Sequence, residues 1–347
     1  MSDSPLRDSV VFVSCADSGE LHVLHLAAAT GQLRTEQVLS LGGQLMPMAL
    51  SPDKKHLYVA RRSDPLAVVT LAVDARAGRA QVIAEAPLPA SMAYLCTDRT
   101  GRWLLAASYG ADMVSVQAVN AQGVVCGASD DTHTYATGRH AHCALATRDN
   151  RFVLAASLGG GQLHRYGLNA STGVLQLTDP PVFAMPQGTG PRHLCFNTRG
   201  DRAYVLGELD AFVHVLAVDS DSGALRLLQS LPTLPQGFDG GAWGADLHLS
   251  PDERWLYTSE RNSHTLAGFS VDATSGILAP VGHWSTQQQP RGFAIAANGA
   301  HVVVAGQASH RVGVHAISAG TGALTPLSEH AVGLNPNWVT MLPLQPV

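Results

Sequence analysis

The sequence predicts an all-β protein: one seven-bladed β-propeller domain that spans residues 1–347, with four antiparallel strands per blade. Three observations lead to this prediction. One strand pattern recurs along the chain, its copies are spaced as propeller blades are, and a final strand is left without a blade of its own. The 34 Gly and 19 Pro also favour short strands and turns over long helices.

The recurring pattern is a polar turn around Asp or Gly, a basic residue, an apolar strand of β-forming residues and a small polar ending. One strand position from each copy gives seven anchor residues, which are Val11, Leu57, Leu104, Val153, Tyr204, Leu256 and Val302. Their separations are 46, 47, 49, 51, 52 and 46 residues, which match the roughly 40–50 residues of a four-stranded blade.

Each anchor strand is expected to have an inner strand before it and a hairpin after it. The hairpin is clearest at 269–284, where Ser-Gly makes a tight turn between two strand-like runs. Inner strands are expected at 45–50, 90–95, 140–145, 191–196, 245–250, 290–295 and 336–341. Because no blade follows the last of these, we expect it to complete the first blade and close the ring.

Charge and cysteine content exclude several classes of protein. The 22 basic and 27 acidic residues give a formal net charge of −5, which offers no basic surface for nucleic acid. No signal peptide or membrane-length apolar run is visible, so we expect a cytoplasmic protein without a membrane partner. The dispersed cysteines predict buried thiols, with neither disulfides nor a zinc knuckle, at Cys15, Cys96, Cys126, Cys143 and Cys195.

Polar residues recur at the ends of the expected inner strands, where the blades of a propeller surround its central channel. Counting back 11 or 12 positions from the anchors gives Met46, Ala93, His142, Arg192 with His193, Ala245 and Arg291. Counting forward four or five gives Arg61 with Arg62, Ser108, Ser157, Glu208, Glu260 with Arg261, and Gln307. Arg, His and Glu are thus concentrated in the third to sixth of the six complete copies.

The chain resembles the seven-bladed propeller lactonase family, whose members include a bacterial 6-phosphogluconolactonase and the fungal carboxy-cis,cis-muconate cyclase. The resemblance runs through nearly the whole chain and is densest at 188–197, 244–262, 289–295 and 305–315. It implies a hydrolase without cofactor or metal that opens 6-phospho-D-glucono-1,5-lactone, a small anionic sugar lactone, to 6-phosphogluconate in the oxidative pentose phosphate pathway.

The resemblance also implies the catalytic residues, which are His142, Arg192, Glu208 and Arg261. Three positions depart from the family's pattern: Gly207 stands where many members have Asn, Glu260 where a neutral residue is expected, and Cys143 in place of Ser. These departures leave the lactonase class intact and bear on the substrate.

Opening a phosphorylated lactone requires an activated water, stabilisation of a tetrahedral oxyanion and cations that hold the phosphate. Arg192, Arg261 and Arg291 are the cations that could meet the last two needs, and Arg291 and His193 are the candidates for binding the substrate or its phosphate. Either His142 or Glu208 can act as general base. A His with a pKa near its ordinary value of about 6.5 accepts a proton at neutral pH, which favours His142.

Each of these residues also has a structural interpretation. The arginines can hold blades together by bonding strand-end carbonyls, and His142 can be a core histidine. Strand alternation would turn the side chain of His193, as the neighbour of a channel residue, into the core between blades. His140 and His142 have the spacing of zinc ligands on a strand, but no third ligand is evident nearby.

Two other functions remain open at this level. One is a lactone-forming or lactone-opening enzyme of muconate catabolism, in which the same residue set would handle a dicarboxylate. The other is a non-catalytic propeller that binds other proteins through one face, because propellers host many functions. The sequence indicates no particular protein partner.

Overall fold

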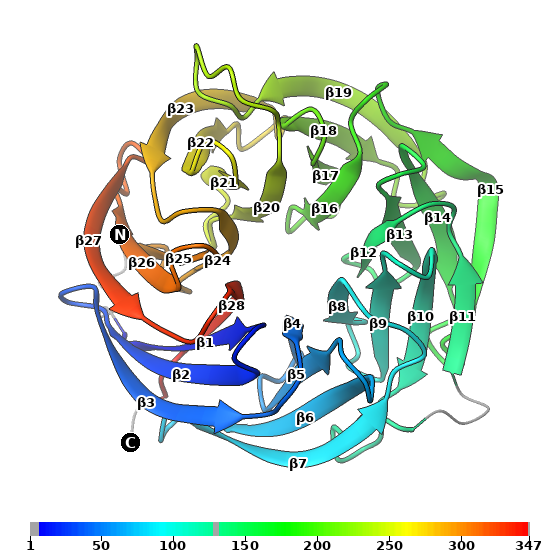
Figure 1. Cartoon of the computed structure of the whole chain (residues 1–347). Helices are drawn as coiled ribbons and strands as arrows, with labels where there is room; N and C mark the ends of the chain where they lie inside the picture. The colour runs from blue at the N-terminus through cyan, green and yellow to red at the C-terminus, as the bar shows by residue number, and fades with distance from the viewer. Residues whose placement is uncertain (1–6, 128–131, 346–347) are drawn as a thin grey trace.

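Seven four-stranded antiparallel sheets form a ring in the computed structural model, which describes residues 7–127 and 132–345 (Figure 1). All the regular elements in these two ranges are strands. The ranges contain no helix long and apolar enough to cross a membrane.

The first three blades occupy the two ends of the chain and its first third. From the centre outward, blade one is β28 (Pro336–Pro343), β1 (Ser9–Cys15), β2 (Glu20–Ala27) and β3 (Gln32–Ser40). Blade two is β4 (Leu45–Leu50), β5 (His56–Arg61), β6 (Ala67–Asp74) and β7 (Arg79–Pro87). Blade three is β8 (Tyr94–Thr97), β9 (Trp103–Ser108), β10 (Met113–Ala118) and β11 (Thr132–Ala136).

The other four blades follow in chain order. Blade four is β12 (Ala141–Ala146), β13 (Phe152–Ser157), β14 (Gln162–Leu168) and β15 (Leu175–Ala184). Blade five is β16 (Pro191–Phe196), β17 (Arg202–Gly207), β18 (Phe212–Val218) and β19 (Leu225–Pro232). Blade six is β20 (Gly244–Leu249), β21 (Trp255–Glu260), β22 (Thr265–Val271) and β23 (Leu278–Ser285). Blade seven is β24 (Pro290–Ile295), β25 (His301–Gly306), β26 (Arg311–Ile317) and β27 (Leu324–Ala331).

The two ends of the chain meet in blade one, as the sequence predicted. Strand β28 pairs antiparallel with β1, so that Thr340 lies opposite Phe12 and Met341 opposite Val11. Figure 1 shows this contact as the red C-terminal strand beside the blue N-terminal one. The propeller prediction is therefore confirmed, including the source of the strand that closes the ring.

The seven anchor residues all lie in the second strand of their blades, as expected. One inner strand differs from the prediction, because β8 begins at Tyr94 and not at residue 90. The carbonyl of Ser91 accepts a hydrogen bond from Ser108 Oγ at 2.8 Å, and the backbone ladder starts only where Ala93 N–H donates to Ala107 O. A side-chain contact thus replaces the first rungs of this strand.

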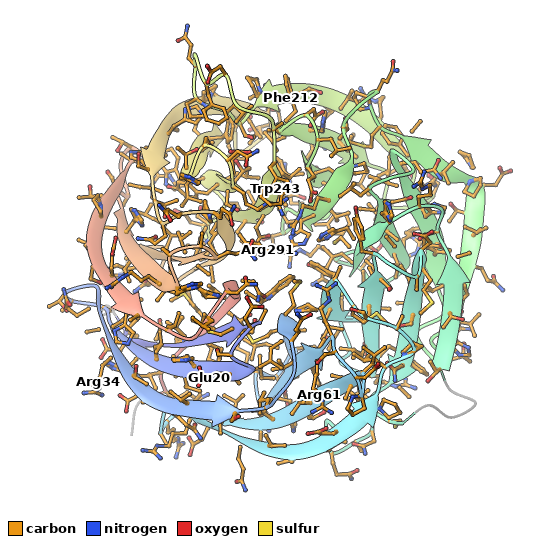
Figure 2. The ribbon with its side chains drawn as sticks, viewed as in Figure 1. Glu20, Arg34, Arg61, Phe212, Trp243 and Arg291 are labelled. Carbon is orange, nitrogen blue, oxygen red and sulfur yellow. The ribbon has the colours of Figure 1, made fainter. Side chains whose placement is uncertain are left out.

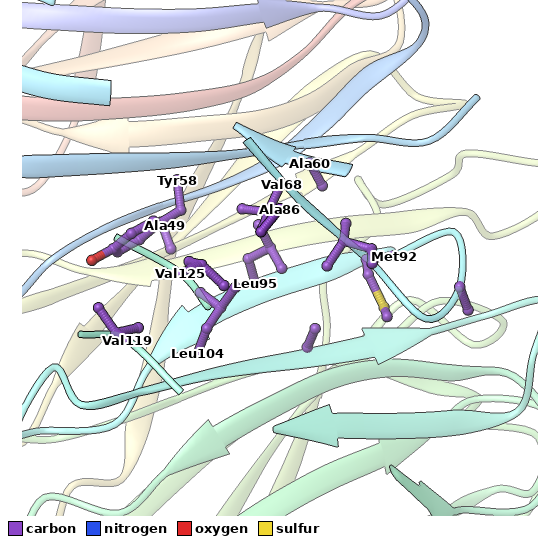
Figure 3. Packing of buried hydrophobic residues seen from close by; sticks show 13 residues of the cluster. Ala49, Tyr58, Ala60, Val68, Ala86, Met92, Leu95, Leu104, Val119 and Val125 are labelled. Atoms are coloured by element: carbon purple, nitrogen blue, oxygen red, sulfur yellow. The ribbon is translucent and has the colours of Figure 1, made fainter. Parts of the chain in front are cut away.

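The apolar core lies between neighbouring blades. One of its clusters brings Tyr58 and Val68 of blade two against Leu95 and Leu104 of blade three (Figure 3). The Tyr58 hydroxyl keeps a polar partner at the edge of this cluster by donating to Gly123 O at 2.9 Å. Both faces of the anchor strands are covered in this way, which fixes each blade against its neighbours.

Six of the seven innermost strands contain one residue more than the strand beside them, near their N-terminal ends. The single extra residue is His142 in β12, Arg192 in β16 and Asn337 in β28. In the other three, two residues oppose one, and these pairs are Met46–Pro47, Ala245–Asp246 and Arg291–Gly292. Such β-bulges bend a strand and redirect a side chain. Here the bulges recur at one end of the central channel and turn side chains of different blades toward the centre of the ring.

Candidate active site

The predicted site residues gather at the bulged end of the ring, and they occupy two kinds of position. His142, Arg192 and Arg291 lie in the bulges of innermost strands. Glu208 and Arg261 are the first residues after β17 and β21. Figure 2 shows Arg291 at the inner end of its blade, facing the centre of the ring. The residues singled out in the sequence therefore come together from blades four to seven.

Glu208 binds two arginines through one carboxylate oxygen. Its Oε2 lies 2.8 Å from Arg192 Nε and 2.9 Å from Arg261 Nη2. The side chain of Arg192 is 1% exposed and that of Glu208 is 14% exposed, so both charges are largely removed from water. Burial opposes ionisation of Glu208, but the two guanidiniums outweigh it and hold the pKa of this carboxyl below its usual range.

The same two arginines also bond backbone carbonyls at the start of blade six. Arg192 Nη1 donates to Ala245 O, which ties blade five to blade six. Arg261 donates to Trp243 O at 3.2 Å and to Gly244 O at 2.9 Å, and its guanidinium lies 3.9 Å from the centre of a Trp243 ring. The carbonyl contact between blades that the structural interpretation foresaw is thus present for Arg192, whereas the carbonyls that Arg261 bonds belong to its own blade.

Asp246 holds His193 in one tautomer. His193 Nδ1 lies 2.8 Å from Asp246 Oδ1, and its Nε2 lies 3.2 Å from Arg192 Nη1. Burial and the charge of Arg192 lower the pKa of His193 to about 4, despite the carboxylate. A neutral ring between an acceptor and a donor must carry its proton on Nδ1 and accept from Arg192 through Nε2. Both ring nitrogens are therefore occupied, so we propose that His193 positions Arg192 and does not bind the phosphate directly.

The expected position of His193 in the core between blades is wrong. Its ring lies 5.1 Å from those of Tyr94 and His142 and 5.6 Å from that of Trp338, which belong to three other innermost strands. The reason is the bulge at Arg192, because an extra residue breaks the alternation on which the expectation depended. These four aromatic rings pack against one another across the centre of the ring.

We expect Asp246→Asn to let the His193 ring populate both neutral tautomers. The substitution should also lower the free energy of unfolding by about 1.5–3 kcal/mol, because hydrogen bonds to a buried charge are lost. Asp246 also pairs with His248 Nε2 at 3.0 Å, and that contact is weakened as well. Nitrogen-15 NMR of the His193 ring and urea denaturation measure the two effects. The control is Asp221→Asn, whose side chain is 95% exposed. An unchanged His193 spectrum would contradict this assignment.

His142 is a buried histidine that pairs with no carboxylate in the described part of the chain. Its side chain packs with the His193 ring, and its Nδ1 has no hydrogen-bond partner among the residues that the structure describes. Burial lowers the pKa of His142 well below its ordinary value, and the positive charges of Arg192 and Arg291 lower it further. The expectation of a nearly ordinary pKa for this ring is therefore wrong. His142 is unprotonated at neutral pH, as a general base must be, but it is a weaker base than predicted.

Arg291 has a neighbour, Arg62, that is not among the predicted catalytic and substrate-binding residues. Arg291 Nη2 lies 3.3 Å from the sulfur of Met46, and Arg62 Nη1 lies 3.0 Å from the same atom. Arg62 is the first residue after β5, the position that Glu208 and Arg261 occupy in their blades. This equivalence was visible in the sequence, because Arg62 follows its anchor residue by five positions, as Arg261 does.

The other carboxylates near the site bind partners of their own. Glu260, which departs from the family's pattern, is buried and accepts hydrogen bonds from the backbone N–H groups of Trp243 and Ser263, both at 2.6 Å. It therefore fixes the loop that carries Trp243 against Arg261. The described part of the chain contains no group of three or more His, Cys, Asp or Glu side chains suited to a metal ion. His140 stacks on Tyr109, with ring centres 4.1 Å apart.

Comparison with known proteins identifies the family of this propeller. The family model for "Lactonase, 7-bladed beta-propeller" matches residues 10–341. The chain belongs to this lactonase family. Among curated relatives, the 6-phosphogluconolactonase of Sodalis glossinidius is 36% identical over 333 residues, which cover 96% of this chain and 98% of the relative.

A second relative of this lactonase, the 6-phosphogluconolactonase of Pectobacterium carotovorum, is 36% identical over 335 residues, 96% of this chain and 99% of its own. Among solved structures, the periplasmic gluconolactonase of Pseudomonas aeruginosa superimposes with a TM-score of 0.89 at 27% identity, covering 97% of this chain and 100% of that protein. The family resemblance seen in the sequence is thereby confirmed.

Proposed function

We propose that this lactonase hydrolyses 6-phospho-D-glucono-1,5-lactone to 6-phosphogluconate. The observation that carries the proposal is a cluster of four arginines at the centre of the ring, Arg62, Arg192, Arg261 and Arg291. Among the described residues, Glu208 is the one carboxylate in ion-pair contact with any of them. A site with this excess of positive charge selects an anionic substrate. The names of the two curated relatives support a phosphorylated sugar lactone as that anion.

In the mechanism that we propose, His142 acts as the general base. It accepts a proton from a water molecule whose oxygen attacks the lactone carbonyl carbon, and the carbonyl oxygen becomes an oxyanion. Arg192 and Arg261, which Glu208 holds in place, are the guanidinium groups that stabilise that charge in this mechanism. When the tetrahedral intermediate collapses, the bond from carbon to ring oxygen breaks and the protonated His142 returns its proton to that oxygen. The lowered pKa of His142 favours this second proton transfer, since it makes the protonated ring a stronger acid than an ordinary histidinium.

The proposal is tested with freshly generated 6-phosphoglucono-1,5-lactone, whose opening is followed against the spontaneous rate. We expect the purified protein to accelerate the reaction without added cofactor or metal. Acceleration of a muconate-type lactone alone would favour the alternative enzyme, and a background rate with both would favour a protein-binding role. The cytoplasmic location remains a prediction.

A further inference from the structure

The four arginines of the site fall into two pairs with different surroundings. Arg192 and Arg261 share Glu208 and donate to backbone carbonyls of blade six. Arg62 and Arg291 have no carboxylate in ion-pair contact among the residues described. The first pair therefore has a direct carboxylate partner, whereas the second has no such ion pair in the described part of the chain.

Arg62 and Arg291 come from blades two and seven and meet at a sulfur atom. Met46 Sδ, in the bulge of β4, contacts Arg62 Nη1 at 3.0 Å and Arg291 Nη2 at 3.3 Å. A thioether is a weak acceptor, so these contacts satisfy little of the hydrogen-bonding capacity of two guanidiniums. Within the described ranges, the Arg62 guanidinium has one further hydrogen-bond partner, Ser91 Oγ at 3.0 Å. Both side chains are partly exposed, unlike the buried Arg192.

Two neighbouring cations without a counter-charge repel each other and are stabilised by a bound anion. A phosphate carries nearly two negative charges at neutral pH and has three terminal oxygens, enough for both guanidinium groups at once. In the lactone substrate the phosphate is several bonds away from the reacting carbonyl. Two pairs of arginines with different partners, one for each end of the substrate, suit that arrangement.

We propose that Arg62 and Arg291 form the subsite for the phosphate group of the substrate, while Arg192 and Arg261 serve the reacting carbonyl. This assignment rests on the function proposed above. It makes Arg62 a residue that determines specificity, and it moves phosphate recognition away from His193 to a pair that joins blades two and seven.

The test compares 6-phosphoglucono-1,5-lactone with glucono-1,5-lactone, which lacks the phosphate. For Arg62→Gln and Arg291→Gln we expect the ratio of kcat/KM between the two substrates to fall by about 10- to 100-fold, the value of one or two charge-assisted hydrogen bonds. Most of the change should be in KM for the phosphorylated lactone. The matched control is Arg61→Gln, which removes the same charge from the neighbouring residue. Arg61 pairs with Glu85 at 2.8 Å and lies farther from the centre than Arg291 (Figure 2).

Three outcomes would overturn the assignment: an equal loss with both substrates, an unchanged ratio, or a ratio that Arg61→Gln lowers as much. If the wild-type protein opens neither lactone, the proposed function fails and the subsite is still tested by calorimetry with inorganic phosphate. Binding that Arg62→Gln and Arg291→Gln weaken at least tenfold supports the pair, and no binding to wild type contradicts it. The thermal midpoints of both variants should not fall, since each variant relieves repulsion between cations.

Discussion

Replacing Glu208 with Gln is expected to lower the free energy of unfolding by about 3–5 kcal/mol and to remove most of the lactonase activity. Glu208 is the carboxylate that compensates Arg192 and Arg261, whose side chains are 1% and 4% exposed. An amide keeps the shape of the side chain but leaves two buried cations beside each other. Urea denaturation and initial rates of lactone opening measure the two losses.

The control for this variant is Glu85→Gln, because Glu85 also pairs with an arginine but is 46% exposed on the outer part of its blade. Surface ion pairs contribute at most about 1 kcal/mol, so the control should be close to wild type in stability and activity. A Glu208→Gln protein as stable and active as this control would refute the role of Glu208 as the counter-charge of the site.

His142→Gln is expected to lower kcat by about 10²–10⁴-fold, the usual contribution of a general base. The wild-type pH profile gives a second readout. A base must be unprotonated, and burial and two arginines lower the pKa of His142 below 6.5. Its activity should therefore persist as the pH falls through 6.5 and decline only at lower pH. The profile of kcat is the one to measure, because the phosphate of the free substrate itself titrates near pH 6.

An acid limb of kcat centred at pH 6.5 or above would contradict the environment assigned to His142. The control is His310→Gln, since His310 is exposed on a turn and should change neither kcat nor its pH dependence. If His142→Gln retains wild-type kcat, Glu208 becomes the candidate base, and its lowered pKa places the acid limb below the ordinary range of a glutamate.

The architecture was predictable because each blade repeats the same physical unit. An apolar anchor strand such as the one around Val153 or Leu256 has both faces covered by neighbouring blades. Because every blade needs such a strand, the same apolar pattern recurs seven times along the sequence. The bulges were not predictable. The residues at these positions include His142, Arg192, Met46 and Asn337, which share no side-chain property, because a bulge depends on backbone geometry relative to the next strand.

The candidate site was predictable in its residues but not in its electrostatics. His142, Arg192, Glu208 and Arg261 follow from the family resemblance, and the structure brings them to one end of the ring. Which arginines are neutralised depends on contacts between blades that are far apart in the chain. Arg62 and Arg291 are more than 200 positions apart, and they meet only through Met46. The lowered pKa of His142 has the same origin, since its charged neighbours come from other blades.

We propose that bulges at one end of the propeller's central channel assemble a cationic site for a phosphorylated lactone. A crystal structure of the protein with the product 6-phosphogluconate tests it most directly. We predict that the phosphate lies between Arg62 and Arg291 and that the new carboxylate lies near His142 and the Arg192–Glu208–Arg261 group. A phosphate bound to Arg192 and Arg261, or a product bound away from the centre of the ring, would contradict the account.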